Sequence, residues 1–146
     1  MKTVTTDIKI LIAEDDRNTL PGLIEILRME GYDVVGVENA RLALKQLVIQ
    51  QFDILLTDLK MPDMNGVQLH LKALKTTPRI KTILMTAFST ALDNVEAKKQ
   101  GIFKILLKPI DLELLFVSIR NAVGQPVIFH QPMELQQATY KSDLYL

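Results

Sequence analysis

Residues 8–13, with the sequence IKILIA, are followed directly by the acidic triplet EDD at 14–16, and this stretch decides the fold. The run is short and almost wholly apolar, which is typical of a strand buried on both faces. The apolar residues after the triplet recur at the spacing of one face of an α-helix: Leu20, Leu23, Ile24 and Leu27. The chain therefore begins with a buried strand, an acidic turn and an amphipathic helix.

The same strand–helix unit recurs four more times along the chain. We expect the further strands at residues 33–37, 52–57, 79–85 and 102–107, each followed by a helical segment. These strands are nearly continuous runs of Ile, Leu and Val, which favours a parallel sheet covered by helices on both faces. Because crossover connections are right-handed, the simplest arrangement is an α/β fold with an open, doubly wound sheet of five strands.

Individual residues support the helix boundaries. Pro21 is compatible with a helix only in its first turn, Gly31 suits the position after a helix end, and Asn39 suits an N-cap. The apolar positions expected for the helix after Asn39 include Leu42, Leu47 and Val48. Those expected for the next helix are Val67, Leu71 and Leu74. The last helix has the clearest apolar stripe, between residues 112 and 123.

Composition narrows the class of protein. The chain has 146 residues, no cysteine, and 17 Lys and Arg against 17 Asp and Glu, so its formal net charge is zero. That balance provides no basic field that would favour nucleic acid and no acidic field that would keep it away, and the lack of cysteine excludes disulfides and thiolate metal sites. The polar start and the lack of a long apolar run predict neither a signal peptide nor a membrane span. We expect a cytoplasmic globular domain, with residues 125–146 as a C-terminal tail or the start of a linker.

Polar side chains collect where the predicted strands end. Glu14 and Asp15 follow the first strand, Asp58 the third, Thr86 the fourth and Lys108 the fifth. Taken singly, each is better explained as a cap, a turn residue or a solvated lysine. Helix capping, however, does not require acids on two strands, a hydroxyl on another and an amine on the last. Ligands of such sheets bind at the carboxyl ends of the strands, so the set predicts a binding crevice.

The acidic cluster has an electrostatic requirement of its own. Carboxylates within about 4–6 Å of one another resist ionising together. A divalent cation removes that penalty, and Mg²⁺ prefers hard oxygen ligands such as these. With the cation and Lys108 in place, the crevice can accept an anion such as a phosphoryl group.

Four pieces of the sequence together resemble the receiver domain of bacterial two-component response regulators. They are ILIAEDD at 10–16, LLTDLKMPDMNG at 55–66, MTA at 85–87 and Lys108-Pro109, and Gly101 lies seven residues before the lysine, as in that family. The resemblance covers residues 1–124 and implies a flavodoxin-like sheet with the strand order 2-1-3-4-5. It also implies a cis Lys108-Pro109 bond.

The resemblance implies a role for each residue of the crevice. Asp58 would be the phosphoacceptor, and Thr86 and Lys108 would contact the phosphoryl oxygens. Mg²⁺ would be held by Glu14, Asp15, Asp58 and the backbone carbonyl of Lys60. The phosphoryl group would come from the phosphohistidine of a sensor histidine kinase or of a histidine phosphotransfer protein in a phosphorelay.

The implied protein is a signalling phosphoprotein, not an enzyme, that assists its own phosphorylation and dephosphorylation and thereby switches an output. The resemblance also points to a homodimer through the last two helices, because Leu114 and Val117 widen the apolar face of the last one. No segment of the chain predicts contact with nucleic acid or with a membrane.

Two departures from the family pattern bear on signal output. Ile105 stands where the family commonly has an aromatic switch residue, and Phe103, two residues earlier, is expected on the same side of the sheet by strand alternation. Phe88 is expected beside the site, where its bulk would slow the access of water to the phosphorylated form. The main alternative is therefore a degenerate receiver that acts as an interaction module without phosphorylation.

Two other classes of protein share parts of the pattern. A flavodoxin-type cofactor binder should have a Ser-, Thr- or Gly-rich phosphate loop after its first strand, whereas the acidic triplet at 14–16 would repel a phosphate. A phosphatase of the haloacid dehalogenase type needs a second Asp two residues after its nucleophile, and Lys60 stands at that position.

Overall fold

The computed structural model describes residues 8–87 and 91–124, and for residues 91–93 it describes the backbone only. The expectations for Phe88 and for the tail at 125–146 lie outside the described residues.

The described chain forms one parallel sheet of five strands in the order β2-β1-β3-β4-β5. The strands are β1 (Lys9–Ala13), β2 (Asp33–Val37), β3 (Ile54–Asp58), β4 (Lys81–Thr86) and β5 (Lys104–Leu107). The fold class predicted from the sequence and the strand order implied by the family resemblance are therefore confirmed. In this order β1 and β3 are neighbours, so their carboxyl ends lie side by side.

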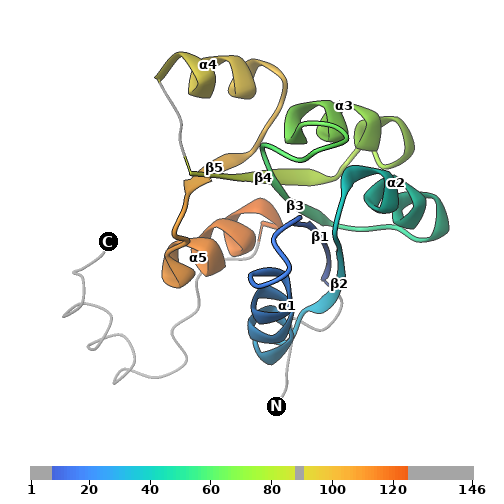
Figure 1. Cartoon of the computed structure of the whole chain (residues 1–146), viewed down its shortest axis with the longest axis vertical. Helices are drawn as coiled ribbons and strands as arrows, with labels where there is room; N and C mark the ends of the chain where they lie inside the picture. Colours follow the sequence, from blue (N-terminus) through green and yellow to red (C-terminus); the bar gives the residue numbers. More distant parts are fainter. Residues whose placement is uncertain (1–7, 88–90, 125–146) are drawn as a thin grey trace.

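Helices cover both faces of the sheet, with α1 and α5 on one side and α2, α3 and α4 on the other (Figure 1). Their bounds are α1 (Leu20–Met29), α2 (Ala40–Ile49), α3 (Gly66–Thr76), α4 (Ala91–Lys99) and α5 (Leu112–Ala122). Among the described residues, no helix is long and apolar enough to cross a membrane.

The core consists of packed clusters on the two faces of the sheet. In β1, Ile10 and Ile12 pack with α1 and α5, whereas Leu11 and Ala13 pack with α2 and α3. All four side chains are fully buried. Because both faces are covered, the strand needs apolar residues at every position, which explains why its sequence shows no alternation.

The helix boundaries agree with the residues that predicted them. Pro21 lies in the first turn of α1, and Gly31 has φ of 97° directly after its C-cap, a conformation that side chains with a Cβ rarely adopt. Asn39 caps α2 by accepting a hydrogen bond from the amide of Leu42 at 2.8 Å. Asn65 begins α3 with a capping box, which links its side chain and backbone to Gln68.

The expected apolar faces of α2 and α3 are partly wrong. Val48 is 78% exposed and Leu71 is 40% exposed. In α3 the structure instead buries Leu69, His70 and Ala73. The face toward the sheet is shifted from the one predicted because a histidine, which reads as polar in the sequence, occupies a core position.

His70 is buried because both of its ring nitrogens have partners. Its Nε2 lies 2.9 Å from the carbonyl oxygen of Gln100, and its Nδ1 lies 2.7 Å from the hydroxyl of Thr82. A carbonyl only accepts, so Nε2 carries the proton and Nδ1 accepts from the hydroxyl of Thr82. Burial lowers the pKa of His70 despite the bond to Gln100, so the ring is neutral at physiological pH.

The expected placement of Phe103 beside Ile105 is also wrong. Strand β5 begins at Lys104, so strand alternation does not extend back to Phe103. The ring of Phe103 packs with the cluster under α1 and α5, whereas Ile105 packs with Leu84 and its neighbours on the opposite face. Phe103 therefore does not take the place of an aromatic ring at position 105.

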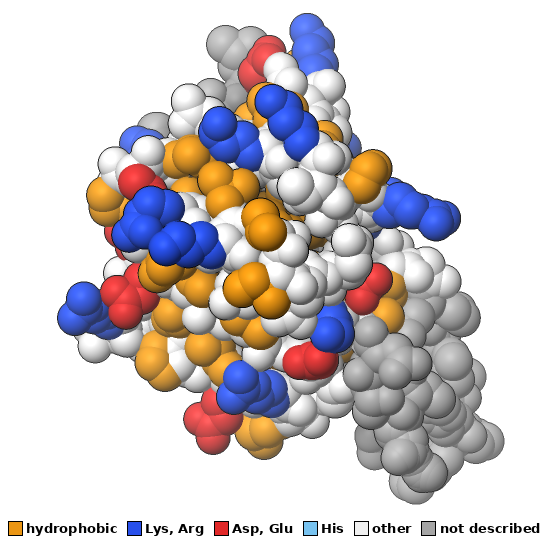
Figure 2. Space-filling view, turned by 90° about the vertical axis from the view of Figure 1, so that its right-hand side faces the viewer, with side chains coloured by type: hydrophobic (Ala, Val, Ile, Leu, Met, Phe, Trp, Pro, Cys, Tyr) orange, Lys and Arg blue, Asp and Glu red, His pale blue; other side chains and the backbone are white. Residues whose placement is uncertain are grey.

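Several large apolar side chains are exposed on the surface. Figure 2 shows the face at the right-hand side of Figure 1, where hydrophobic side chains are interspersed with Lys and Arg. Val48 and Ile49, at the end of α2, are 78% and 70% exposed. Single exposed apolar residues of this kind are normal on a folded protein and carry no conclusion by themselves.

Gly66 provides a test of the packing at the end of β3. A Cβ at this position would lie 2.4 Å from the carbonyl oxygen of Asp58 and 2.8 Å from Cδ2 of Leu84. We expect Gly66→Ala to lower the free energy of unfolding by about 1–3 kcal/mol, because the start of α3 must move away from the strand. Urea unfolding followed by circular dichroism measures the change.

Gly22 is the matched control, because a Cβ there would have no neighbour within 4 Å. Gly22→Ala should raise the free energy of unfolding by about 0.5–1 kcal/mol through the better helix propensity of alanine. Equal effects of the two substitutions would contradict the close contact at Gly66.

Candidate functional site

The carboxyl edge of the sheet brings the predicted site residues together. Glu14 follows β1, Asp58 ends β3, Thr86 ends β4 and Lys108 follows β5. Carboxylate oxygens of Glu14, Asp15 and Asp58 all lie within 4.8 Å of one another. The convergence of the acids, which the sequence could only predict through the strand order, is therefore present in the fold.

Lys108 joins the two buried acids of this cluster. Its Nζ lies 2.6 Å from Oδ1 of Asp58 and 3.0 Å from Oε1 of Glu14. Its backbone amide donates to the carbonyl of Thr86 at 2.8 Å, which holds the end of β5 against the end of β4. The Lys108-Pro109 peptide bond is cis, as expected.

Burial and hydrogen bonding divide the proton unequally between the two acids. Glu14 is fully buried and Asp58 is 4% exposed. Burial, followed by the hydrogen bond with Glu14, raises the pKa of Asp58 to about 8 although Lys108 opposes the change. Burial also raises the pKa of Glu14, but hydrogen bonds from Asp58, the Asp16 amide and Lys108 outweigh it, and the net pKa is lowered.

Without a cation, then, the carboxyl of Asp58 holds a proton and donates it to the Glu14 carboxylate. Lys108 remains charged, because its contacts with Asp58 and Glu14 outweigh the effect of burial and raise its pKa. Asp15, the third acid, is exposed to solvent and opens the cluster to the outside. The site thus combines a buried carboxyl, a charged ammonium held against it and an acid that is open to solvent.

The connection between β3 and α3 is held by hydrogen bonds at both of its ends. The amide of Leu59 donates to the carbonyl of Met85 at 2.8 Å, and the amide of Gly66 donates to the carbonyl of Leu59 at 2.7 Å. Asp63 lies between Leu59 and Gly66 in the sequence, and its carboxylate accepts hydrogen bonds from two backbone amides of α2. Our reading of the sequence missed Asp63, because its partners are 22 and 23 residues away and no local pattern reports them.

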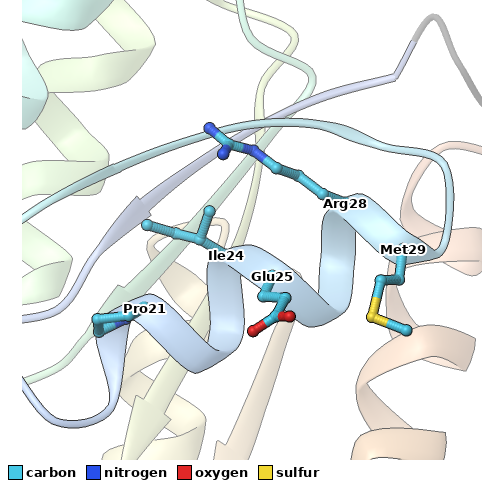
Figure 3. Close-up of a pocket in the computed structure, with 5 residues that line it drawn as sticks. All are labelled: Pro21, Ile24, Glu25, Arg28 and Met29. Carbon is cyan, nitrogen blue, oxygen red and sulfur yellow. The ribbon is translucent and has the colours of Figure 1, made fainter.

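A shallow hollow on α1 has a different character. It is lined by Pro21, Ile24, Glu25, Arg28 and Met29, all from one helix (Figure 3). The guanidinium of Arg28 donates to the carbonyl of Val34 at 2.9 Å and so serves the packing of α1 on β2. Glu25 is the single acid of the hollow. Converging reactive groups are found at the carboxyl edge of the sheet and not at this helix.

Comparison with known proteins agrees with this location. The family described as "Response regulator receiver domain" matches residues 10–120, which include every residue of the acidic cluster and Lys108. The chain belongs to this family. It is a receiver domain of a two-component response regulator, which is a signalling domain.

Two relatives and one solved structure show the extent of the similarity. GlrR of Escherichia coli (strain K12), a transcriptional regulatory protein, is 35% identical over 120 residues, which cover 80% of this chain and 26% of GlrR. The receiver protein CpdR of Brucella abortus (strain 2308) is 34% identical over 113 residues, which cover 77% of this chain and 94% of CpdR. The response regulator TrrA of Thermotoga maritima, solved in complex with Mg²⁺-BeF, has a TM-score of 0.70 at 25% identity, covering 79% of this chain and 98% of TrrA. This receiver chain thus spans about a quarter of the length of GlrR.

The donor set of the receiver domain fits a divalent cation. The three acids offer carboxylate oxygens, which are hard ligands of the kind that Mg²⁺ binds. A cation here would also stabilise the ionised carboxylate of Asp58 against burial and the nearby charge of Glu14, which now keep a proton on it. The remaining predicted ligand, the carbonyl of Lys60, belongs to the residue two positions after Asp58, and its role stays a prediction.

The raised pKa of Asp58 predicts how the stability of the metal-free receiver domain depends on pH. Between pH 7 and pH 8 the folded protein keeps a proton that the unfolded chain, with an ordinary carboxyl pKa near 4, has already released. Because the folded state binds more protons, the free energy of unfolding falls as the pH rises, until Asp58 ionises at about 8. The slope for one proton is at most about 1.4 kcal/mol per pH unit.

Urea unfolding in the presence of a chelator, repeated across this pH range, measures the slope. Asp58→Asn is the control, because an amide does not titrate and the slope should disappear. Glu14 is ionised in both states across this range. His70, whose pKa is lowered by burial, adds only a small slope of opposite sign near pH 7, and this slope is the same in both proteins and cancels in the comparison. A variant with the same slope as the wild type would show that another group releases the proton.

Proposed function

We propose that Asp58 is the phosphoacceptor of this receiver domain and that its phosphorylation switches the output of the regulator. The observation that carries the proposal is the contact between Nζ of Lys108 and Oδ1 of Asp58 at 2.6 Å, inside a cluster of three acids. A buried carboxyl beside a fixed ammonium can accept a phosphoryl group, because the ammonium offsets the negative charge that the group brings.

The transfer itself follows from the placement of these groups. An oxygen of the Asp58 carboxylate attacks the phosphorus of a phosphohistidine, the O–P bond forms, and the P–N bond breaks to release the histidine. Lys108 pairs with a phosphoryl oxygen, and the hydroxyl of Thr86, at the end of β4, donates to another. When bound, Mg²⁺ neutralises charge on the acids and on the phosphoryl oxygens. Glu14, Asp15, Asp58 and the Lys60 carbonyl are the ligands that we propose for it.

The complex of TrrA with Mg²⁺-BeF supports a magnesium-dependent site of this kind. The phosphodonor is a histidine kinase or a histidine phosphotransfer protein, as befits a receiver domain. Residues 1–124 form the receiver, and residues 125–146 are a tail or the start of a linker to an output domain. An output in transcription is consistent with the relatives that regulate it, such as GlrR. We place the protein in the cytoplasm, because its phosphodonor would act there.

No described residue favours the alternative of a degenerate receiver. The three acids, Thr86 and Lys108 are all present at the carboxyl edge of the sheet. Ile105, which packs with Leu84, departs from the common family pattern only at the position of the aromatic switch residue, which concerns signal output and not phosphorylation.

Phosphorylation can be tested on the isolated chain. Incubation with a small phosphodonor such as acetyl phosphate, in the presence of Mg²⁺, should add the mass of one phosphoryl group to the wild type. Asp58→Asn should gain none, because the amide is not a nucleophile for this transfer. Intact-mass spectrometry reads both proteins, and omission of Mg²⁺ is the control for the metal. Equal labelling of wild type and variant would defeat the assignment of Asp58.

A homodimer through the last two helices is a second prediction about partners. The segment from α4 to α5 exposes large apolar side chains on each element: Val95, Leu107, Leu112 and Leu114. We expect Mg²⁺ and beryllofluoride to shift the protein toward a dimer in sedimentation velocity, and Leu114→Glu to reverse the shift. Val48→Glu, on α2, is the matched control and should leave the shift unchanged. A monomer under both conditions would remove the dimer from the proposal.

A further inference from the structure

Asp63 lies in the connection between β3 and α3 but forms its hydrogen bonds with a different helix. Its Oδ2 accepts from the amide of Arg41 at 2.9 Å, and its Oδ1 accepts from the amide of Ala40 at 3.3 Å. These are the first two residues of α2. The carboxylate therefore bridges two segments that are more than 20 residues apart in the chain.

Two side chains together satisfy the free amides at the start of α2. Asn39 accepts from Leu42 at 2.8 Å and is a local cap, because it belongs to the chain that enters the helix. The carboxylate of Asp63 accepts the hydrogen bonds from the amides of Ala40 and Arg41, and it belongs to a segment outside α2. The helix could be capped by Asn39 with water on the other amides, so the contribution of Asp63 is the tie between segments.

Electrostatics stabilise this tie. Burial raises the pKa of Asp63, but the amide donors of Arg41 and Ala40 outweigh burial and hold the pKa below its ordinary value. The carboxylate is charged at neutral pH, and it faces the positive end of the α2 dipole. An amide side chain at this position would lose the charge and one of the two accepting oxygens.

The tied connection is the one that leads out of Asp58. It begins at Leu59 and contains Lys60 before it reaches Asp63. Asp15, Asn39, Pro62 and Asp63 line one cleft beside the acidic cluster, so the tie lies at the edge of the site. The connection is held on one side of Lys60 by the bonds of Leu59 to Met85 and Gly66, and on the other side by the bonds of Asp63 to α2.

We propose that Asp63 is a positioning residue for the metal site, which places the Lys60 backbone against the acids by anchoring the connection to the start of α2. This inference rests on the proposed function, since it assigns a residue to the cation that phosphorylation requires. Loss of the tie leaves the acids in place but frees the connection. Residues that orient metal ligands from outside the ligand set typically change metal affinity by about 10–100-fold when mutated.

The matched pair Asp63→Ala and Asn39→Ala separates positioning from helix stability. Each variant removes a cap of α2, so both should lower the urea midpoint of the metal-free protein. Only Asp63→Ala also frees the connection, and we expect it to weaken Mg²⁺ binding about 10-fold or more in isothermal titration calorimetry. Asn39→Ala should change the affinity less than twofold, and Asp63→Asn should fall between the wild type and Asp63→Ala.

Hydrogen exchange of the metal-free protein gives a readout that does not depend on metal or phosphate. Asp63→Ala should speed exchange at the amides of residues 60, 61, 63 and 64, whereas Asn39→Ala should speed it only at the start of α2. Equal effects of the two variants on exchange and on Mg²⁺ affinity would reduce Asp63 to a helix cap and overturn the inference.

The two proposals fail in different ways. A wild type that binds no Mg²⁺ and takes up no phosphoryl group would overturn the proposed function, and with it the role of Asp63 toward the metal. A wild type that binds Mg²⁺ and is phosphorylated, with Asp63→Ala unchanged in affinity, would overturn the inference about Asp63 alone.

Discussion

The contact of the Lys108 ammonium with the side chains of Asp58 and Glu14 is the interaction on which the rest of this structure depends. The three groups come from positions 14, 58 and 108, and only a parallel sheet with β1 beside β3 brings the two acids together. Charged groups at such depth are unfavourable unless they are paired. Three features keep this cluster inside the protein: the sheet order, the hydrogen bond from the Lys108 amide that holds the end of β5 against β4, and the proton retained on Asp58.

Much of the fold could be predicted because its signals are local. A strand covered on both faces needs apolar residues at successive positions, and residues 10–13 supply them. Asn39 reports a helix start because its side chain bonds three residues ahead. The candidate site could be located because parallel strands place their ends at one edge, so the acids and Lys108 had to lie on it.

The rest depended on contacts between distant parts of the chain. Leu71 is on the exposed side of α3 because His70 takes the core position, which requires Thr82 and Gln100 as partners. Phe103 lies just before β5, which begins two residues later than expected, so the alternation of the strand does not fix the side on which its ring packs. The role of Asp63 was hidden for the same reason, since its partners are in α2.

The His70 bridge has a mechanical consequence for α4. Of the side chains described in that helix, at residues 94–99, Ala97 alone is buried. The imidazole reaches the carbonyl of Gln100, just after the helix, and a Cβ added at the adjacent Gly101 would lie 3.4 Å from Nε2. The neutral ring of His70 thus connects the C-terminal end of α4 to α3 through a hydrogen bond.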